Sequence, residues 1–191
     1  MLAKKTTQNR SSMVNGINLD ALRVVMQDVE RDPALGIVEF RMKSQWQGQA
    51  RSCAKVESYS IGGKKVDRTF AIDIDEPFEL LGENTAPNPQ EVLMSALNAC
   101  VMVGYVVGAA VKGITLARLE IETRGELDLR GFLGIDASVR PGYEKIHYVV
   151  HIKGDGTPEQ FRDIHETVMK TSPNYFNITH PVAIDAELRV E

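Results

Sequence analysis

Apolar residues recur along this chain with two different periods, and the change of period separates predicted helices from predicted strands. Leu19, Leu22 and Val29 follow helical spacing, so the sequence predicts a helix that begins near residue 18 and closes at Pro33 and Gly36. After it, apolar residues and turn residues alternate in short runs. These runs predict a meander of strands over 37–46, 50–59 and 70–74, with turns at 47–49 and 61–64 and one buried face on the last strand.

The most apolar part of the chain is predicted to be a helix over 92–111. Asn88 is a favoured N-cap, Pro89 suits the first helical position, and Glu91 stands in capping-box register. Twenty mostly apolar residues are also long enough to cross a bilayer. Asn98 in the middle of the segment and the polar, strand-like flanks favour instead a helix buried in a protein core, with its glycines allowing close helix packing.

The remainder of the chain returns to strands and one further helix. Strands are predicted over 116–121, 126–130 and 143–153, and a capped helix after Thr157 that breaks at 171–174. Val182 to Val190 alternates as a final strand. Strands, a buried helix, more strands and a helix together predict an α+β fold with antiparallel sheets around the long central helix.

This pattern divides the chain into three predicted parts. Residues 1–15 are expected to form a disordered tail, residues 16–36 an N-terminal helical extension, and residues 37–191 a single folded domain. The start is polar and lacks the apolar region of a secretory signal, which favours a cytoplasmic protein. Its lack of acidic residues resembles a transit peptide only loosely, because no amphipathic stretch rich in Arg and Ser follows.

Composition excludes several classes of function. The 191 residues carry a formal charge of −4, which gives no electrostatic footprint for nucleic acid or a membrane surface. The two cysteines, Cys53 and Cys100, are too few for a disulfide scaffold or a four-thiolate zinc site. His147 and His151 are four strand residues apart, about 13 Å, too far for one metal ion. No cofactor or metal is expected, and no phosphate-binding or hydrolase motif is present.

Cys100 is the residue whose chemistry decides the interpretation. It lies in the middle of the predicted central helix, where a buried thiol most often packs as a small apolar group. Reactivity would need a nearby cation or a hydrogen-bond network that stabilises the thiolate. The start of the helix is too distant to supply it, because the field of a helix terminus falls off within the first turn.

Three segments resemble the OsmC/Ohr family of osmotically inducible and organic hydroperoxide resistance proteins. They are Asp75–Glu76–Pro77, the run N-P-Q-E-V-L-M-S-A-L-N-A-C over 88–100, and S-P-N-Y-F-N over 172–177. The resemblance covers roughly residues 38–191 and is most specific over the loop and the start of the central helix. It implies an OsmC-like fold, an intertwined homodimer with sites at the subunit interface, and residues 1–37 outside the common core.

The resemblance also implies thiol-dependent reduction of organic hydroperoxides, a peroxiredoxin-type activity in the oxidative stress response. Cys100 falls on the family's peroxidatic cysteine, whose thiolate attacks the peroxide bond and becomes a sulfenic acid. An arginine stabilises that thiolate in the family. Arg51, just after the turn at 47–49, is the best match here, and Arg68 is its competitor.

Two positions depart from the family pattern, and both fall where we place substrate binding. Ser172 stands where the family has its resolving cysteine, and Gln90 where the peroxidases have an acid that helps to hold the arginine. Glu91, the next residue, points about 100° away on the helix and serves as a cap. A standard two-cysteine peroxidase is therefore not expected.

Three hypotheses remain open from the sequence. The first is a one-cysteine peroxidase that an external thiol reduces, with Cys53, which shares a strand face with Arg51, as a resolving thiol in one variant. The second is a non-catalytic dimer that binds a small apolar ligand at the subunit interface. The third is a structural or regulatory dimer in which Cys100 is only a core residue.

Overall fold

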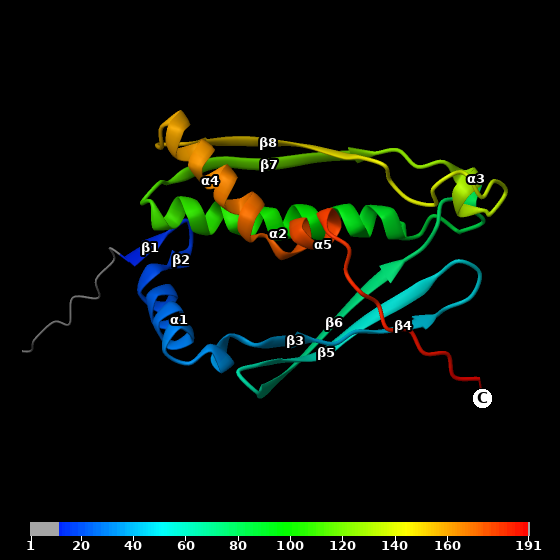
Figure 1. Ribbon diagram of the computed structural model, residues 1–191, viewed down its shortest axis with the longest axis horizontal. Coiled ribbons are helices and arrows are strands. Elements are labelled where there is room, and N and C mark those ends of the chain that lie inside the picture. The colour runs from blue at the N-terminus through cyan, green and yellow to red at the C-terminus, as the bar shows by residue number, and fades with distance from the viewer. Residues whose placement is uncertain (1–11, 191) are drawn as a thin grey trace, which may run out of the picture. The chain divides into compact units, whose positions relative to one another are not determined.

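The computed structural model describes residues 12–190 (Figure 1). They form two compact units, which divide between Ser95 and Ala96. The division falls within the long helix α2, Pro89–Val111. The domain predicted over 37–191 therefore spans both units, and each unit is described by itself below.

The N-terminal extension of the first unit is a small hairpin followed by a helix. Strands β1 (Met13–Val14) and β2 (Ile17–Asn18) pair through a turn, and α1 (Leu19–Arg31) follows directly. The Asn18 side chain accepts hydrogen bonds from the first turn of α1, which explains where the helix begins. The predicted helix is confirmed, and a short 3₁₀ turn, Pro33–Gly36, closes it. Met13 and Val14, within the range 1–15 predicted as a tail, pair in β1, and residues 1–11 lie outside the described part.

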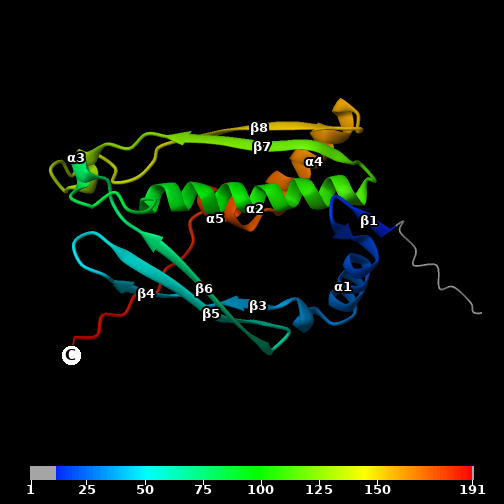
Figure 2. The ribbon, with the colours of Figure 1, turned by 180° about the vertical axis from the view of Figure 1, so that it is seen from behind.

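The first unit is built around a long antiparallel hairpin. Strands β5 (Ser52–Ile61) and β6 (Lys64–Ile74) pair along most of their length, as Figure 2 shows, through a turn in which two glycines adopt positive φ. On the other edge of β5 lie β3 (Val38–Phe40) and β4 (Lys43–Trp46). The predicted meander is confirmed. The buried face predicted for β6 is not found, since every β6 residue before Ile74 is exposed in this chain.

The second unit packs the apolar helix between a sheet and two helices. Strands β7 (Leu116–Gly125) and β8 (Ile146–Gly154) form an antiparallel ladder along α2, and α4 (Pro158–Thr171) and α5 (Pro173–Thr179) complete the unit (Figure 1). Core side chains come from α2, the loop after it and α4: Leu97, Val101, Tyr105, Ala109, Ile114, Ile164 and Val168. The inward residues of β7 and β8 cover this cluster. The strand order and central helix agree with the predicted α+β fold.

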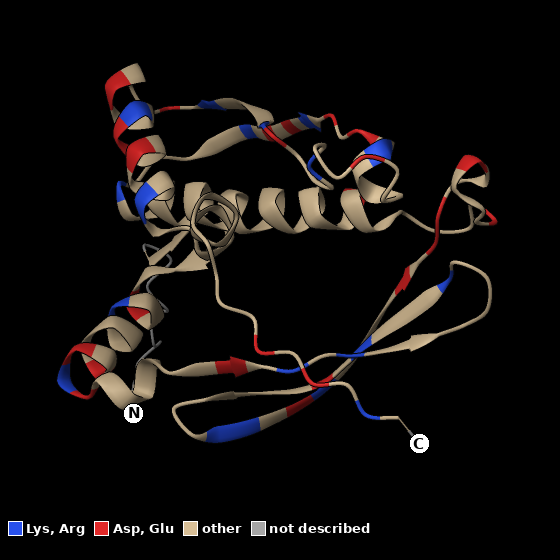
Figure 3. Cartoon of the chain, turned by 45° about the vertical axis from the view of Figure 1, so that its right-hand side comes forward, with Lys and Arg blue, Asp and Glu red and all other residues tan. Residues whose placement is uncertain are grey.

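Helix α2 is the one described helix long and apolar enough to cross a membrane by length and composition. Figure 3 shows how few charged residues it carries, since α2 is drawn tan over nearly all of its length. A core helix of a soluble protein passes the same test, and here Leu97, Val101 and Tyr105 are buried against protein. We therefore assign α2 as the core helix of the second unit.

Two segments of the second unit differ from the sequence prediction. Residues 126–130, predicted as a strand, lead into the short helix α3 (Leu129–Phe132), because the Asp128 side chain accepts a hydrogen bond from the Arg130 amide and caps a helical turn. Residues 182–190, predicted as a final strand, pair with no strand of the described chain. Their alternating apolar side chains are exposed, with Ile184 and Val190 each 87% accessible.

Candidate functional site

Cys100 and Ser172, two of the predicted site residues, are in contact in the second unit. Cys100 is half-buried on α2, and the Ser172 hydroxyl donates a hydrogen bond to its sulfur across 3.3 Å. Ser172 is itself 5% exposed, so little water reaches the contact from the serine side. A hydroxyl donor aimed at the sulfur stabilises negative charge there, because a hydrogen bond to a charged acceptor is stronger than one to a neutral acceptor.

The junction of α4 and α5 fixes the position of Ser172. Helix α4 ends at Thr171, and Ser172 is at once its C-cap and the N-cap of α5, where its oxygen accepts a hydrogen bond from the Tyr175 amide. Pro173 then occupies the first helical position, which its fixed φ favours. The Asn174 amide donates to the Ala96 carbonyl across 2.8 Å and so joins α5 to α2 one turn before Cys100. The contact between Ser172 and Cys100 is therefore fixed at several points.

Close packing between α2 and α4 holds the same region. A side chain added at Gly104 would lie 3.0 Å from Val168, and one added at Gly108 would lie 3.0 Å from Ile164. The close helix packing predicted from these glycines is thus present. Tyr105 is 1% exposed, and its hydroxyl is hydrogen-bonded to Nδ1 of His165 on α4. Burial raises the pKa of Tyr105 above its usual value, so the phenol stays protonated in this pair.

Arg51, the arginine predicted to act with Cys100, belongs to the first unit and is held there by a carboxylate. Its Nη1 lies 2.8 Å from Oε2 of Glu83, and Nη2 donates more weakly to the Gln47 carbonyl. Both partners of the ion pair are more than two-fifths exposed. The sequence comparison with the family missed Glu83, because it looked for the acid at position 90.

The loop that carries Glu83 is organised by a buried carboxylate. Asp75 is fully buried and accepts hydrogen bonds from the backbone amides of Glu76, Glu83 and Thr85, and from the Thr85 hydroxyl. Burial alone would raise the pKa of Asp75, but these hydrogen bonds outweigh it and hold the pKa at about 2. Gly82 is needed in this loop, since a Cβ there would lie 1.8 Å from the Glu76 carbonyl oxygen.

The remaining predicted residues have other surroundings. Gln90 is the second residue of α2 and makes no side-chain hydrogen bond to a described residue. Glu91 accepts from the Asn88 amide while Asn88 accepts from Glu91, so the predicted capping box is confirmed. Arg68 lies over the rings of Tyr59 and Phe70, at 4.8 and 5.6 Å from their centroids.

Cys53, the other thiol, lies in the first unit on β5. It is opposite Asp73 in the ladder with β6. A hydrogen bond to Asp73, burial and the negative charge of that carboxylate together raise the pKa of the Cys53 thiol. Less thiolate at neutral pH makes Cys53 a poorer nucleophile. Within residues 12–190, no group of histidine, cysteine or acidic side chains has the arrangement of a metal site.

Comparison with known proteins adds a family and a fold to this geometry. A family model described as OsmC-like protein matches residues 82–187. An OsmC-like protein from Mycoplasma pneumoniae is 16% identical, with a TM-score of 0.58 over 74% of this chain and 87% of its own. A protein from Psychrobacter arcticus 273-4, named for osmotic stress induction and a detoxification response, is 18% identical, with a TM-score of 0.56 over 73% and 88%.

A third solved structure belongs to the same group. The OsmC-like protein VCA0330 of Vibrio cholerae, of unknown function, is 15% identical, with a TM-score of 0.51 over 72% of this chain and 91% of its own. No curated protein matches this chain. At these identities the structures show that the fold is shared, and the motif residues must be judged by their own contacts.

Proposed function

The chain belongs to the OsmC-like protein family, and from this premise we propose that it reduces organic hydroperoxides with the thiol of Cys100 and an external thiol reductant. The resemblance seen in the sequence and the α+β fold are both confirmed. The peroxide chemistry itself is our proposal. The P. arcticus relative, whose name refers to osmotic stress and detoxification, is in keeping with a role of this kind.

The hydrogen bond from Ser172 to Cys100 is the observation that carries the proposal. A cysteine that served only as a core residue would be surrounded by apolar side chains, as Val101 and Leu97 are. Cys100 instead meets a buried hydroxyl that caps a separate helix. The same hydroxyl is placed to donate to the anionic sulfur before oxidation and to the sulfenate oxygen or sulfur after it.

The proposed reaction has three balanced steps. The Cys100 thiolate attacks the terminal oxygen of ROOH, the O–O bond breaks, and a proton completes ROH, leaving Cys100 as a sulfenic acid. An external thiol R′SH attacks the sulfenic sulfur, releasing water and forming a mixed disulfide. A second R′SH then attacks that disulfide, releasing R′SSR′ and the Cys100 thiol. An external thiol is needed because Ser172 cannot form a disulfide.

We assign Arg51 as the cation that serves the Cys100 thiolate in this proposal, and Glu83 as the residue that positions Arg51. A guanidinium bound to one carboxylate oxygen keeps further N–H donors for a second anion. Glu83 thus supplies the contact that Gln90, lacking a charge, cannot supply. Gln90 and Ser172 remain our assignments for the substrate side of the site.

We further propose that the protein acts as a cytoplasmic, intertwined homodimer with its sites at the subunit interface. The exposed, alternating apolar side chains of residues 182–190 support this, since they have the pattern of a strand and lack a partner strand among the described residues. Light scattering of the purified chain would give the mass of a dimer. A monomer at micromolar concentration would contradict this part of the proposal.

Peroxide-dependent oxidation of Cys100 is the direct test. The purified chain would be treated with cumene hydroperoxide, trapped with dimedone and analysed by peptide mass spectrometry, while loss of peroxide is followed with and without dithiothreitol. We expect a dimedone adduct on Cys100 and catalytic loss of peroxide only with the dithiol. Cys100→Ser should abolish both, and Cys53→Ser should change neither.

Two outcomes would contradict the peroxidase. Absence of the Cys100 adduct at peroxide excess would remove the first step. Unchanged peroxide consumption in Cys100→Ser would place the chemistry elsewhere. In either case native mass spectrometry for a retained apolar ligand would decide whether the non-catalytic binding dimer is the better description.

A further inference from the structure

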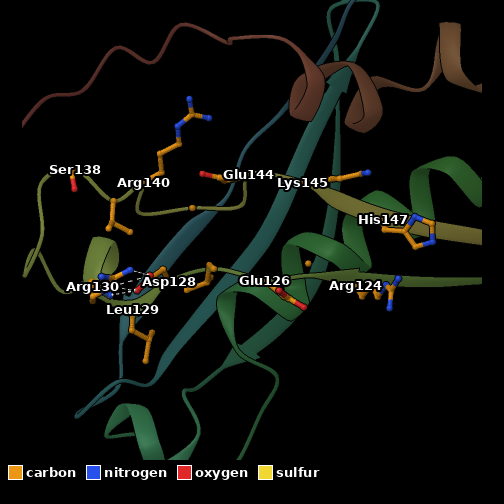
Figure 4. Close-up of a pocket in the computed structure, with 14 residues that line it drawn as sticks. Arg124, Glu126, Asp128, Leu129, Arg130, Ser138, Arg140, Glu144, Lys145 and His147 are labelled. Atoms are coloured by element: carbon orange, nitrogen blue, oxygen red, sulfur yellow. Dashed lines mark hydrogen bonds and ion pairs between the residues drawn. The ribbon is translucent and has the colours of Figure 1, made fainter.

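A cavity of about 900 Å³ lies at the end of the β7–β8 ladder (Figure 4). Neither Cys100 nor Ser172 is among the residues that line it. It opens between the residues that continue β7 and the segment that leads into β8. Backbone hydrogen bonds hold the wall of the cavity in place, since the Arg130 carbonyl accepts hydrogen bonds from the backbone amides of Ile135 and Asp136. A Cβ at Gly131 would lie 2.4 Å from the Arg140 carbonyl oxygen, so α3 and residues 139–140 are packed together without space for a side chain.

One end of the cavity is lined by three basic side chains. Arg124 on β7 is directly opposite His147 on β8, and Lys145, the residue before β8, lines the same cavity. Figure 4 shows Arg124, Lys145 and His147 towards one end and the Arg130–Asp128 pair towards the other. Within residues 12–190, none of these three basic side chains forms an ion pair or a side-chain hydrogen bond.

Among the arginines of residues 12–190, lack of a partner is confined to this cavity. Arg118, on the same strand and face as Arg124, is bound to Glu120, and Arg130 is bound to Asp128. Every other described arginine meets a carboxylate or lies over aromatic rings, except Arg124 and Arg140. Both exceptions line this cavity. The Arg124 guanidinium and the Lys145 ammonium carry like charges in one cavity, so a bound anion would reduce their repulsion.

We propose that this cavity binds a small molecule through an oxyanion, carboxylate or phosphate, held by Arg124, Lys145 and His147. Arginine and lysine donors suit both anions, and the imidazole adds a further N–H. Two carboxylates, Glu126 and Glu144, also line the cavity without an ion-pair partner among the described residues. They weaken the binding of a bare anion and favour a ligand that also carries an amino or hydroxyl donor. This site is independent of the proposed peroxidase.

Titration of the full-length chain with inorganic phosphate and, separately, with succinate tests the proposal. Binding would be measured by calorimetry and by shifts of the backbone amide resonances in NMR spectra. We expect saturable binding of at least one probe, strongest shifts near residues 124 and 145–147, and weaker binding as salt is raised. Arg124→Gln should weaken binding about tenfold, the loss expected for one charge-assisted hydrogen bond. The tighter probe identifies phosphate or carboxylate as the preferred anion.

Two variants make the test specific. Arg118→Gln removes a cation from the same strand and face outside the cavity and should leave binding unchanged. Glu126→Gln removes a negative charge from the cavity and should strengthen the binding of phosphate. The proposal is overturned if neither probe binds at millimolar concentration, or if Arg118→Gln weakens binding as much as Arg124→Gln. It is also overturned if the largest NMR shifts occur at residues outside the cavity.

Discussion

The Ser172 hydroxyl and the Cys100 sulfur lie 3.3 Å apart, although 72 positions separate them in the sequence. Residue 172 is therefore in reach of the sulfur that the family resemblance identifies as reactive, but as an alcohol it can only donate a hydrogen bond. A sulfur at the same position would need to move by about 1 Å to reach the S–S separation of about 2 Å that a disulfide needs.

The first prediction follows from this geometry. In a Cys53→Ser background, Ser172→Cys should convert the chain into a two-cysteine peroxidase. Peroxide treatment should then give an intramolecular disulfide between residues 172 and 100, seen as the loss of two hydrogens by intact mass spectrometry. Ser172→Ala in the same background is the control and should stop at the sulfenic acid. A trapped Cys100 sulfenate without any disulfide in Ser172→Cys would contradict the contact.

The second prediction concerns Glu83, which lies 2.8 Å from Arg51. Because Glu83 positions Arg51, Glu83→Gln should lower the second-order rate of Cys100 oxidation about tenfold, the effect of one charged hydrogen bond. Stopped-flow measurements of peroxide oxidation would give this rate. The melting temperature should hardly move, since exposed ion pairs contribute about 0–1 kcal/mol.

A neighbouring glutamate provides the matched control. Glu79 lies in the 3₁₀ turn Phe78–Leu80 of the same loop and forms no ion pair among the described residues. Glu79→Gln should keep the full oxidation rate. Equal rates in Glu83→Gln and the unmodified chain would show that Glu83 does not position Arg51 for this reaction.

The sequence predicted elements well where their signals are local. The capping box at Thr157 and Gln160 and the one at Asn88 and Glu91 each identify a helix start within a few residues. The strand predicted over 182–190 was not found. Alternation of apolar and polar residues indicates on which side of a strand each side chain would lie, but it does not identify a neighbouring strand to pair with. The Asp128 cap similarly overrode the strand pattern over 126–130.

The site was predictable only in part for a related reason. The motif comparison identified Cys100 and Ser172, and the structure brings them together. Glu83 lies 32 positions from Arg51, so no local spacing connects them, and the family pattern directed attention to Gln90. The signal that could have indicated this loop was Asp75–Glu76–Pro77 followed by glycine and asparagine, a pattern typical of a turn in which an aspartate side chain accepts backbone hydrogen bonds.

The third prediction concerns acid stability. The lowered pKa of Asp75 means that its ionised form stabilises the fold above the unfolded value, near 3.9, and that this contribution is lost as pH falls from about 4 to about 2. Urea unfolding at pH 7, 4 and 2.5 should show Asp75→Asn less stable than the unmodified chain at pH 7. The difference should narrow below pH 4. Asp67→Asn, an exposed aspartate on β6, should show little difference at any pH. A gap for Asp75→Asn that stays constant with pH would contradict the assigned role.

The last prediction concerns the packing of α2 on α4. In an open helix, Gly104→Ala would stabilise the fold by about 1 kcal/mol, because alanine is the better helix former. Here the new Cβ would lie 3.0 Å from a methyl group of Val168, which is 2% exposed and has a stiff, branched side chain. Overpacking of about 1–3 kcal/mol should therefore outweigh the gain and lower the free energy of unfolding.

A double-mutant cycle separates this contact from other effects of the same substitution. Val168→Ala removes the methyl groups that Gly104→Ala would meet, so the double variant should be more stable than the sum of the single effects predicts, by about 1 kcal/mol. Urea unfolding of the four proteins measures the coupling. Gly142→Ala, whose Cβ would meet nothing within 4 Å, is the control and should be near neutral. Additive effects of Gly104→Ala and Val168→Ala would show that the two helices do not approach at this point as closely as the structure places them.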